Sequence, residues 1–104
     1  MRIAAIIVIA SQLALAAAAS ADEVTVGQAG KAFNPTDLQV KVGDSVKFNN
    51  DDTVAHAVLV KGPHETNLGQ MKPGDAKSVS FDQAGTYDVK CAIHPKMKLT
   101  ITVQ

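Results

Sequence analysis

Four side chains with metal-binding chemistry lie in the second half of the sequence. Cys91, His94 and Met97 follow one another at intervals of three residues, and His56 stands on an earlier apolar segment. Two imidazoles and a thiolate in a plane, with a weak thioether on the axis, are the ligands of blue-copper electron-transfer sites. We therefore predict that these four residues bind one copper ion, which alternates between Cu(I) and Cu(II).

Other interpretations of the same residues stay open at this stage. Each of the four is an ordinary core residue when taken singly, and only their combination points to a metal. Zinc is the competing metal, with Asp51 or Asp52 in place of Met97, because methionine is not among the usual zinc ligands. A hydrolase that used Cys91 and His94 would need a third, orienting group, and none is evident.

The closure of the predicted site indicates the class of function. Four protein donors leave no open position for a substrate, unlike catalytic metal sites. We therefore predict a carrier of single electrons rather than an enzyme. The alternative is a protein that stores or delivers copper, which would expose additional Met and His donors. From residue 22 onward only Met71 and His64 are available for that role, and His64 lies in a polar turn where we expect it to be exposed.

The first 21 residues have the pattern of an export signal. A positive charge at Arg2 precedes two apolar runs, and Ala19-Ser20-Ala21 fits the small-residue cleavage motif of a secretory signal peptide. We expect cleavage before Asp22 and a periplasmic protein. The apolar stretch is shorter than the roughly 20 residues that span a bilayer, so we expect no stable membrane insertion.

Residues 22–104 are expected to form a single small domain. Its one cysteine, Cys91, excludes an intrachain disulfide, and a bound metal would explain an odd cysteine in an exported protein. Lysines and acidic residues are close to balanced and are interspersed along the chain, which argues against a nucleic-acid partner.

The domain reads as strands throughout. Apolar and polar residues alternate with a period of two in seven short segments separated by Gly, Pro, Asn and Asp, which predicts an all-β fold, a Greek-key β-sandwich of about seven to eight strands. The segments are Glu23–Val26, Leu38–Val42, Ser45–Asn49, His56–Val60, Lys77–Phe81, Thr86–Cys91 and Leu99–Val103.

The region from Asn34 to Gln104 resembles the cupredoxins, the plastocyanin/azurin family of type 1 blue copper proteins. The short loop Cys-x2-His-x2-Met with Pro95 after the histidine is similar to the amicyanin type, and Tyr87 before Cys91 also fits the family. The resemblance implies a cupredoxin-like sandwich and electron transport. It also implies roles for the four donors, with His56, Cys91 and His94 as equatorial ligands and Met97 as the axial one.

Two positions depart from the family pattern. The family commonly has Asn after the first histidine ligand and Ser or Thr after the cysteine, whereas this chain has Ala57 and Ala92. Because both polar partners are absent together, neither is left unpaired. We expect the backbone N–H of Ala57 to reach the Cys91 sulfur instead.

The resemblance also implies where partners dock. A redox protein donor and an acceptor are expected to bind a monomer near His94, whose ring edge should reach the surface. Small apolar residues, with Pro95, Pro35 and Met71 as candidates, should surround it, and Lys96 should supply a basic edge. We expect Lys31 and Lys61 to lie away from this surface.

Overall fold

The computed structural model describes residues 21–104, and within this range it contains nine strands and no helix. Residues 1–20 lie outside the described residues, so the signal peptide and its cleavage site stay predictions. The strands are β1 (Glu23–Ala29), β2 (Ala32–Asn34), β3 (Asp37–Val40), β4 (Ser45–Asn50), β5 (His56–Lys61), β6 (Thr66–Met71), β7 (Ala76–Ser80), β8 (Gly85–Cys91) and β9 (Lys98–Val103). In this range there is therefore no helix that could cross a membrane.

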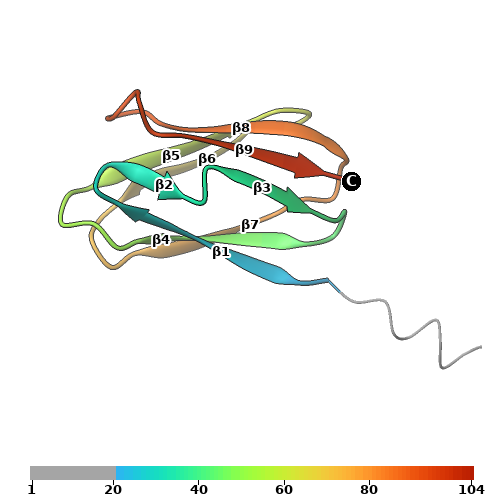
Figure 1. The fold of residues 1–104 in the computed structure, drawn as a ribbon, viewed down its shortest axis with the longest axis horizontal. Helices are drawn as coiled ribbons and strands as arrows, with labels where there is room; N and C mark the ends of the chain where they lie inside the picture. The colour runs from blue at the N-terminus through green and yellow to red at the C-terminus, as the bar shows by residue number, and fades with distance from the viewer. Residues whose placement is uncertain (1–20) are drawn as a thin grey trace, which may run out of the picture.

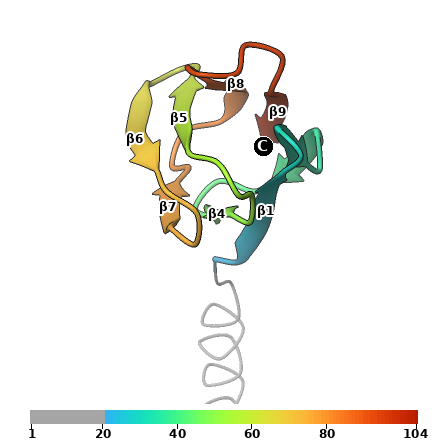
Figure 2. The ribbon, with the colours of Figure 1, turned by 90° about the vertical axis from the view of Figure 1, so that its left-hand side faces the viewer.

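The strands form two sheets that face each other, which confirms the predicted all-β sandwich. One sheet has the order β2-β1-β4-β7, and the other has the order β3-β9-β8-β5-β6. Figure 2 looks toward one end of the sandwich and shows β5, β6, β8 and β9 on one side and β1, β4 and β7 on the other. Two pairings are parallel, β1 with β4 and β3 with β9, while the other pairs are antiparallel.

The alternation in the sequence becomes the two faces of each strand. In β5 the residues His56, Val58 and Val60 are buried, and those between them are partly exposed. In β8 the buried positions are Tyr87, Val89 and Cys91. Because successive side chains of a strand point to opposite faces, one face of each sheet fills the core between the sheets.

Strands β2 and β6 are not among the segments predicted from the sequence, and both depend on glycine conformations. The turn before β2 has two residues with positive φ, Gly30 at 60° and Lys31 at 57°, which is the backbone of a tight hairpin. In β6, Gly69 has a φ of 69°, and the register with β5 shifts between Val58 and Leu59. That irregularity is typical of a β-bulge and interrupts the alternation on which the prediction relied.

Four connections gather at one end of the sandwich, on the left in Figure 1. They are the β1–β2 turn, the β4–β5 loop, the β6–β7 loop and the β8–β9 loop. The first residue of β5 and the last residue of β8 lie at this same end, because the two strands are antiparallel neighbours with Val58 opposite Cys91. The C-terminus and the start of β1 lie at the other end.

Candidate metal centre

Strand pairing brings the predicted ligands together. His56 opens β5, Cys91 ends β8, and both are buried on the inner face of the same sheet. His94 follows on the β8–β9 loop and is half-buried. The ligand atoms of His56, Cys91 and His94 all lie within 4.8 Å of one another.

The three donor atoms form a triangle of the size that a metal ion requires. His56 Nδ1 lies 3.1 Å from His94 Nδ1, and Cys91 Sγ lies 3.8 Å and 3.7 Å from these two nitrogens. The point in their plane that is equidistant from all three lies about 2.1 Å from each, close to the usual metal–imidazole distance of about 2.0–2.1 Å. The residues present therefore fit one small transition-metal ion.

Asp52 orients the ring of His56, which is fully buried. Its Oδ2 lies 3.0 Å from His56 Nε2. An ionised carboxylate can only accept, so Nε2 carries the hydrogen and Nδ1 presents its lone pair to the site. Asp52 therefore contacts the nitrogen on the far side of the ring from the donor cluster, which disfavours it as the fourth ligand in the zinc alternative.

The loop that carries Asp52 is itself held by hydrogen bonds. The backbone N–H groups of Lys31 and Thr53 donate to its carboxylate at 2.9 and 2.8 Å. With the hydrogen bond from His56, they hold the pKa of Asp52 below its ordinary value. The buried Asn50 accepts from the Asp52 N–H at 3.0 Å and donates to the carbonyl of Val54 at 3.0 Å. The carboxylate thus stays ionised and in place.

Met97 is positioned by the short β8–β9 loop. Its side chain is 1% exposed, and its N–H donates to the carbonyl of His94 at 2.9 Å. This hydrogen bond ties together the last two predicted ligands on the loop. The next residue, Lys98, begins β9, so the loop is anchored directly by a core strand.

The two alanines that replace the family's polar pair are joined through the backbone. The N–H of Ala57 donates to Cys91 Sγ at 3.4 Å, as predicted. The N–H of Ala92 donates to the carbonyl of Ala57 at 2.9 Å. Hydrogen bonds from the protein to a thiolate stabilise its charge. In this chain main-chain groups supply the contacts at Ala57 and Ala92, with no polar side chain at either position.

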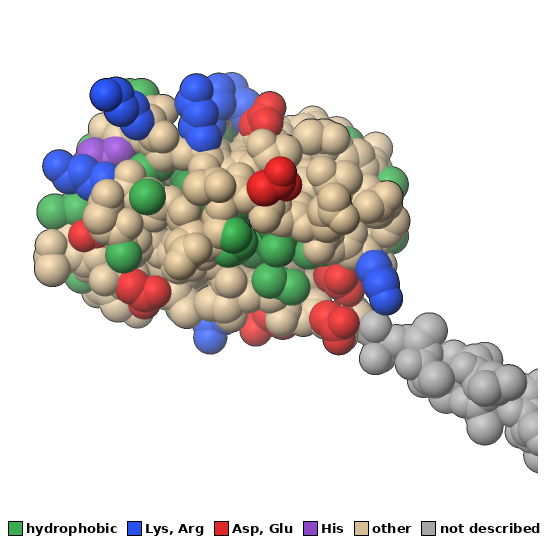
Figure 3. All heavy atoms as spheres, in the orientation of Figure 1, with side chains coloured by type: hydrophobic (Ala, Val, Ile, Leu, Met, Phe, Trp, Pro, Cys, Tyr) green, Lys and Arg blue, Asp and Glu red, His purple; other side chains and the backbone are tan. Residues whose placement is uncertain are grey.

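A surface hollow borders His94. It is lined by Lys31, Ile93, His94, Pro95 and Lys96, and Ile93 is 50% exposed. Figure 3 shows a histidine at the surface of this end of the molecule beside lysine side chains. Lys31, which we expected to be distant, therefore belongs to this surface, because the β1–β2 turn lies at the same end as the β8–β9 loop.

Two further expectations are wrong. Met71 is fully buried and accepts a hydrogen bond from the Gln28 side chain at 3.6 Å, so it is a core residue and not part of a surface ring. His64 is half-buried rather than exposed, with its ring 5.2 Å from that of Tyr87 in an edge-on arrangement. Neither packing could be read from the local sequence, because it depends on contacts between distant strands.

The chain is similar in sequence to known proteins, among them amicyanin and pseudoazurin. Amicyanin from Paracoccus denitrificans is 35% identical over 107 residues, covering 92% of this chain and 77% of that protein. Pseudoazurin from Methylorubrum extorquens is 34% identical, covering 93% of this chain and 74% of that protein.

Solved structures agree with these relatives. The structure of an amicyanin variant with Cu(I) superposes with a TM-score of 0.73 at 30% identity, covering 79% of this chain and 82% of that one. A Cu-containing nitrite reductase from Thermus scotoductus superposes with a TM-score of 0.74 at 31% identity, but the chain spans only 22% of that protein's length. The family model described as Cupredoxin-like domain matches residues 2–103. The resemblance inferred from the sequence is thereby confirmed, and the chain belongs to the cupredoxin family.

Proposed function

We propose that this protein binds one copper ion through His56 Nδ1, Cys91 Sγ, His94 Nδ1 and the Met97 thioether, and that it carries single electrons between redox proteins. The observation that carries the proposal is the triangle of two imidazole nitrogens and one thiol sulfur, with separations of 3.1, 3.7 and 3.8 Å. Copper supplies the one-electron couple. Thiolate and thioether suit Cu(I), and imidazole suits both oxidation states.

The protein's own contribution is to keep the donors in one arrangement. His56 is fixed by Asp52, Cys91 by the Ala57 N–H, and Met97 by the His94 carbonyl. Two of the donors lie on neighbouring strands of one sheet. A site held in this way changes shape little when the charge of the ion changes, which favours fast electron transfer over exchange of the metal.

Delivery of copper is the second candidate function, and the remaining donors give it little support. A delivery protein needs donors that can pass the ion to or from the site. Of the residues available for this, Met71 is buried in the core and His64 packs against Tyr87. In the described part of the chain, His64 does not belong to the donor cluster of His56, Cys91 and His94.

The proposed function is tested by the spectrum and the redox behaviour of the purified protein. With one equivalent of Cu(II) we expect intense blue or blue-green absorption from thiolate-to-copper charge transfer. Repeated reduction and reoxidation should reverse this absorption fully, with copper retained in the presence of a competing chelator. A colourless Cu(II) complex, or loss of copper to the chelator on each cycle, would favour delivery instead.

The proposed function also includes a cellular compartment, the periplasm. Residues 1–21 would direct export and be removed, leaving residues 22–104 as a monomeric, periplasmic domain. The order of positive charge, apolar runs and Ala19-Ser20-Ala21 supports this cleavage. The similarity of this chain to amicyanin and pseudoazurin supports a role in electron transfer.

Partners are proposed to dock over His94, where the hollow has an apolar centre and two lysines. The exposed Ile93 and Pro95 offer contact area, and Lys31 and Lys96 add positive charge. Charges at the edge of an interface act mainly on association rate and salt dependence. The partner that complements these charges is a redox protein with acidic residues around the surface through which it exchanges electrons.

The charge at this surface can be tested with a small anionic oxidant. Lys96→Glu should slow oxidation of the Cu(I) protein by hexacyanoferrate(III) roughly three- to tenfold at low ionic strength. The loss should shrink as salt screens the charge, and the blue spectrum should be unchanged.

Lys61→Glu is the matched control. Lys61 ends β5, at the opposite end of the strand from His56, and is exposed. This variant should oxidise at nearly the rate of the unmodified protein. If the two substitutions slow the reaction equally, electrons do not leave through the His94 surface.

A further inference from the structure

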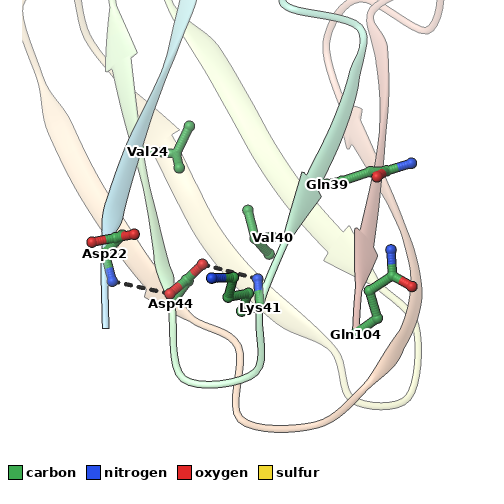
Figure 4. A pocket seen from close by; sticks show the side chains of 7 residues that line it. All are labelled: Asp22, Val24, Gln39, Val40, Lys41, Asp44 and Gln104. Carbon is green, nitrogen blue, oxygen red and sulfur yellow. Dashed lines mark hydrogen bonds between the residues drawn. The ribbon is translucent and has the colours of Figure 1, made fainter. Parts of the chain in front are cut away.

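A buried carboxylate lies at the end of the sandwich opposite the metal centre. Asp44 is 6% exposed and sits in a hollow whose lining includes Asp22, Lys41 and Gln104 (Figure 4). Its Oδ1 accepts a hydrogen bond from the N–H of Asp22, and its Oδ2 accepts one from the N–H of Lys41, each at 2.9 Å. These bonds, from Asp22 and then from Lys41, hold the pKa of Asp44 below its ordinary value.

The nitrogen of Asp22 is held at this carboxylate by the pairing of β1 with β4. The N–H of Ser45 donates to the carbonyl of Asp22 at 2.9 Å, and Glu23 is registered with Ser45 in the parallel ladder. Asp22 therefore has a hydrogen bond on both sides of its α-carbon. A shift of one residue along the chain would bring a different nitrogen to Asp44.

We propose that Asp44 is the binding site for the free α-ammonium group of the processed chain. The inference builds on the proposed cleavage before Asp22. Hydrolysis of the Ala21–Asp22 bond adds the hydroxyl of water to the Ala21 carbonyl carbon and a hydrogen to the Asp22 nitrogen. The amine formed takes up a proton from solvent below its ordinary pKa of about 8. Cleavage thus converts one neutral N–H donor beside Asp44 into a cation with three.

The pair this creates has a defined pH dependence. Other charged groups at the hollow are the Lys41 ammonium, which also lowers the pKa of Asp44, and the carboxylate of Asp22 itself. The nearby carboxylate favours the charged amine, so the folded protein should hold the proton more tightly than the unfolded chain. The resulting stability is fully present below the unfolded pKa and is lost as pH rises through the folded pKa.

The test compares three forms of the copper-loaded protein. One begins at Asp22, one begins at Asp22 with an acetylated nitrogen, and one retains Ala21 as its first residue. The acetylated form keeps the N–H bond to Asp44 but lacks the charge. The form with Ala21 keeps the charge but moves it one residue away. In each form the melting temperature is measured near pH 7 and above pH 10, and NMR follows titration of the α-amine.

The form that begins at Asp22 should melt several degrees above the other two near pH 7, and this difference should vanish at high pH. Its α-amine pKa should lie about one pH unit above the ordinary value. Asp44→Asn should return that pKa to normal. If this variant fails to fold, the acetylated form still isolates the charge.

Two results would overturn the proposal, and they are distinguishable. An ordinary α-amine pKa, with equal melting temperatures in all three forms, would show that Asp44 anchors only the backbone. An exported protein whose first residue is not Asp22 would show that cleavage places the ammonium elsewhere. Neither result bears on the copper spectrum, so the metal site is tested separately.

Discussion

Cys91→Ser is expected to abolish the intense visible absorption of the Cu(II) protein. The colour arises from charge transfer from a thiolate to copper, and serine offers no sulfur. The fold should survive, because serine is nearly the same size and its hydroxyl can still accept the Ala57 N–H, as Cys91 Sγ does at 3.4 Å. An absorption spectrum and a melting curve of the variant with one equivalent of Cu(II) check both statements.

Met97→Ala is the companion variant at the other end of the loop. An axial thioether binds weakly in sites of this type, so most of the colour should remain while the reduction potential shifts. Cyclic voltammetry gives the potential. If Cys91→Ser keeps the strong band, or if Met97→Ala removes it, the assignment of equatorial and axial ligands is wrong.

Asp52→Asn is expected to weaken copper binding by about tenfold or more, the usual cost of removing a partner that orients a metal-ligating histidine. The asparagine oxygen can still accept from His56 Nε2, but the amide lacks the negative charge that makes the ring a better donor. In the orientation that keeps this bond, the NH2 group takes the place of Oδ1 and cannot accept from the Thr53 N–H as the carboxylate does. Competition with a Cu(I) chelator measures the affinity.

The neighbouring Asp51 provides the control. Asp51 is exposed, and in the described residues its carboxylate has no hydrogen bond to the site. Changing Asp51 to Asn removes one negative charge from the same loop, as Asp52→Asn does. Asp51→Asn should leave affinity close to that of the unmodified protein. Equal weakening by both variants would mean that the loop's net charge matters and the contact with His56 does not.

The sequence was sufficient to predict the strands that alternate but not the order in which they pair. Period two identifies a half-buried strand and carries no information on direction, so the parallel pairings of β1 with β4 and β3 with β9 were not predictable. β6 was missed because Gly69 and a shift of register break its alternation.

The cluster of His56, Cys91 and His94 could be predicted because Cys91 and His94 share one short loop. The sequence suggests Asp52 only as an alternative zinc ligand, because nothing in its neighbourhood shows that it contacts His56 Nε2. The spacing of Asp52 and His56 was the available signal, and it is common by chance. Lys31 was misplaced for a related reason, since its turn reaches the metal centre only through the pairing of the sheets.

Both terminal strands occupy interior positions in their sheets. β1 lies between β2 and β4, and β9 lies between β3 and β8. The sheet β2-β1-β4-β7 has all its strands once β7 is made, but the other sheet does not, because β3 has no partner in it until β9 is made. Folds dominated by such distant pairings form slowly. The chain should therefore remain unfolded until its last strand has been synthesised, a delay that would suit the export proposed above, in which the chain crosses a membrane before it folds.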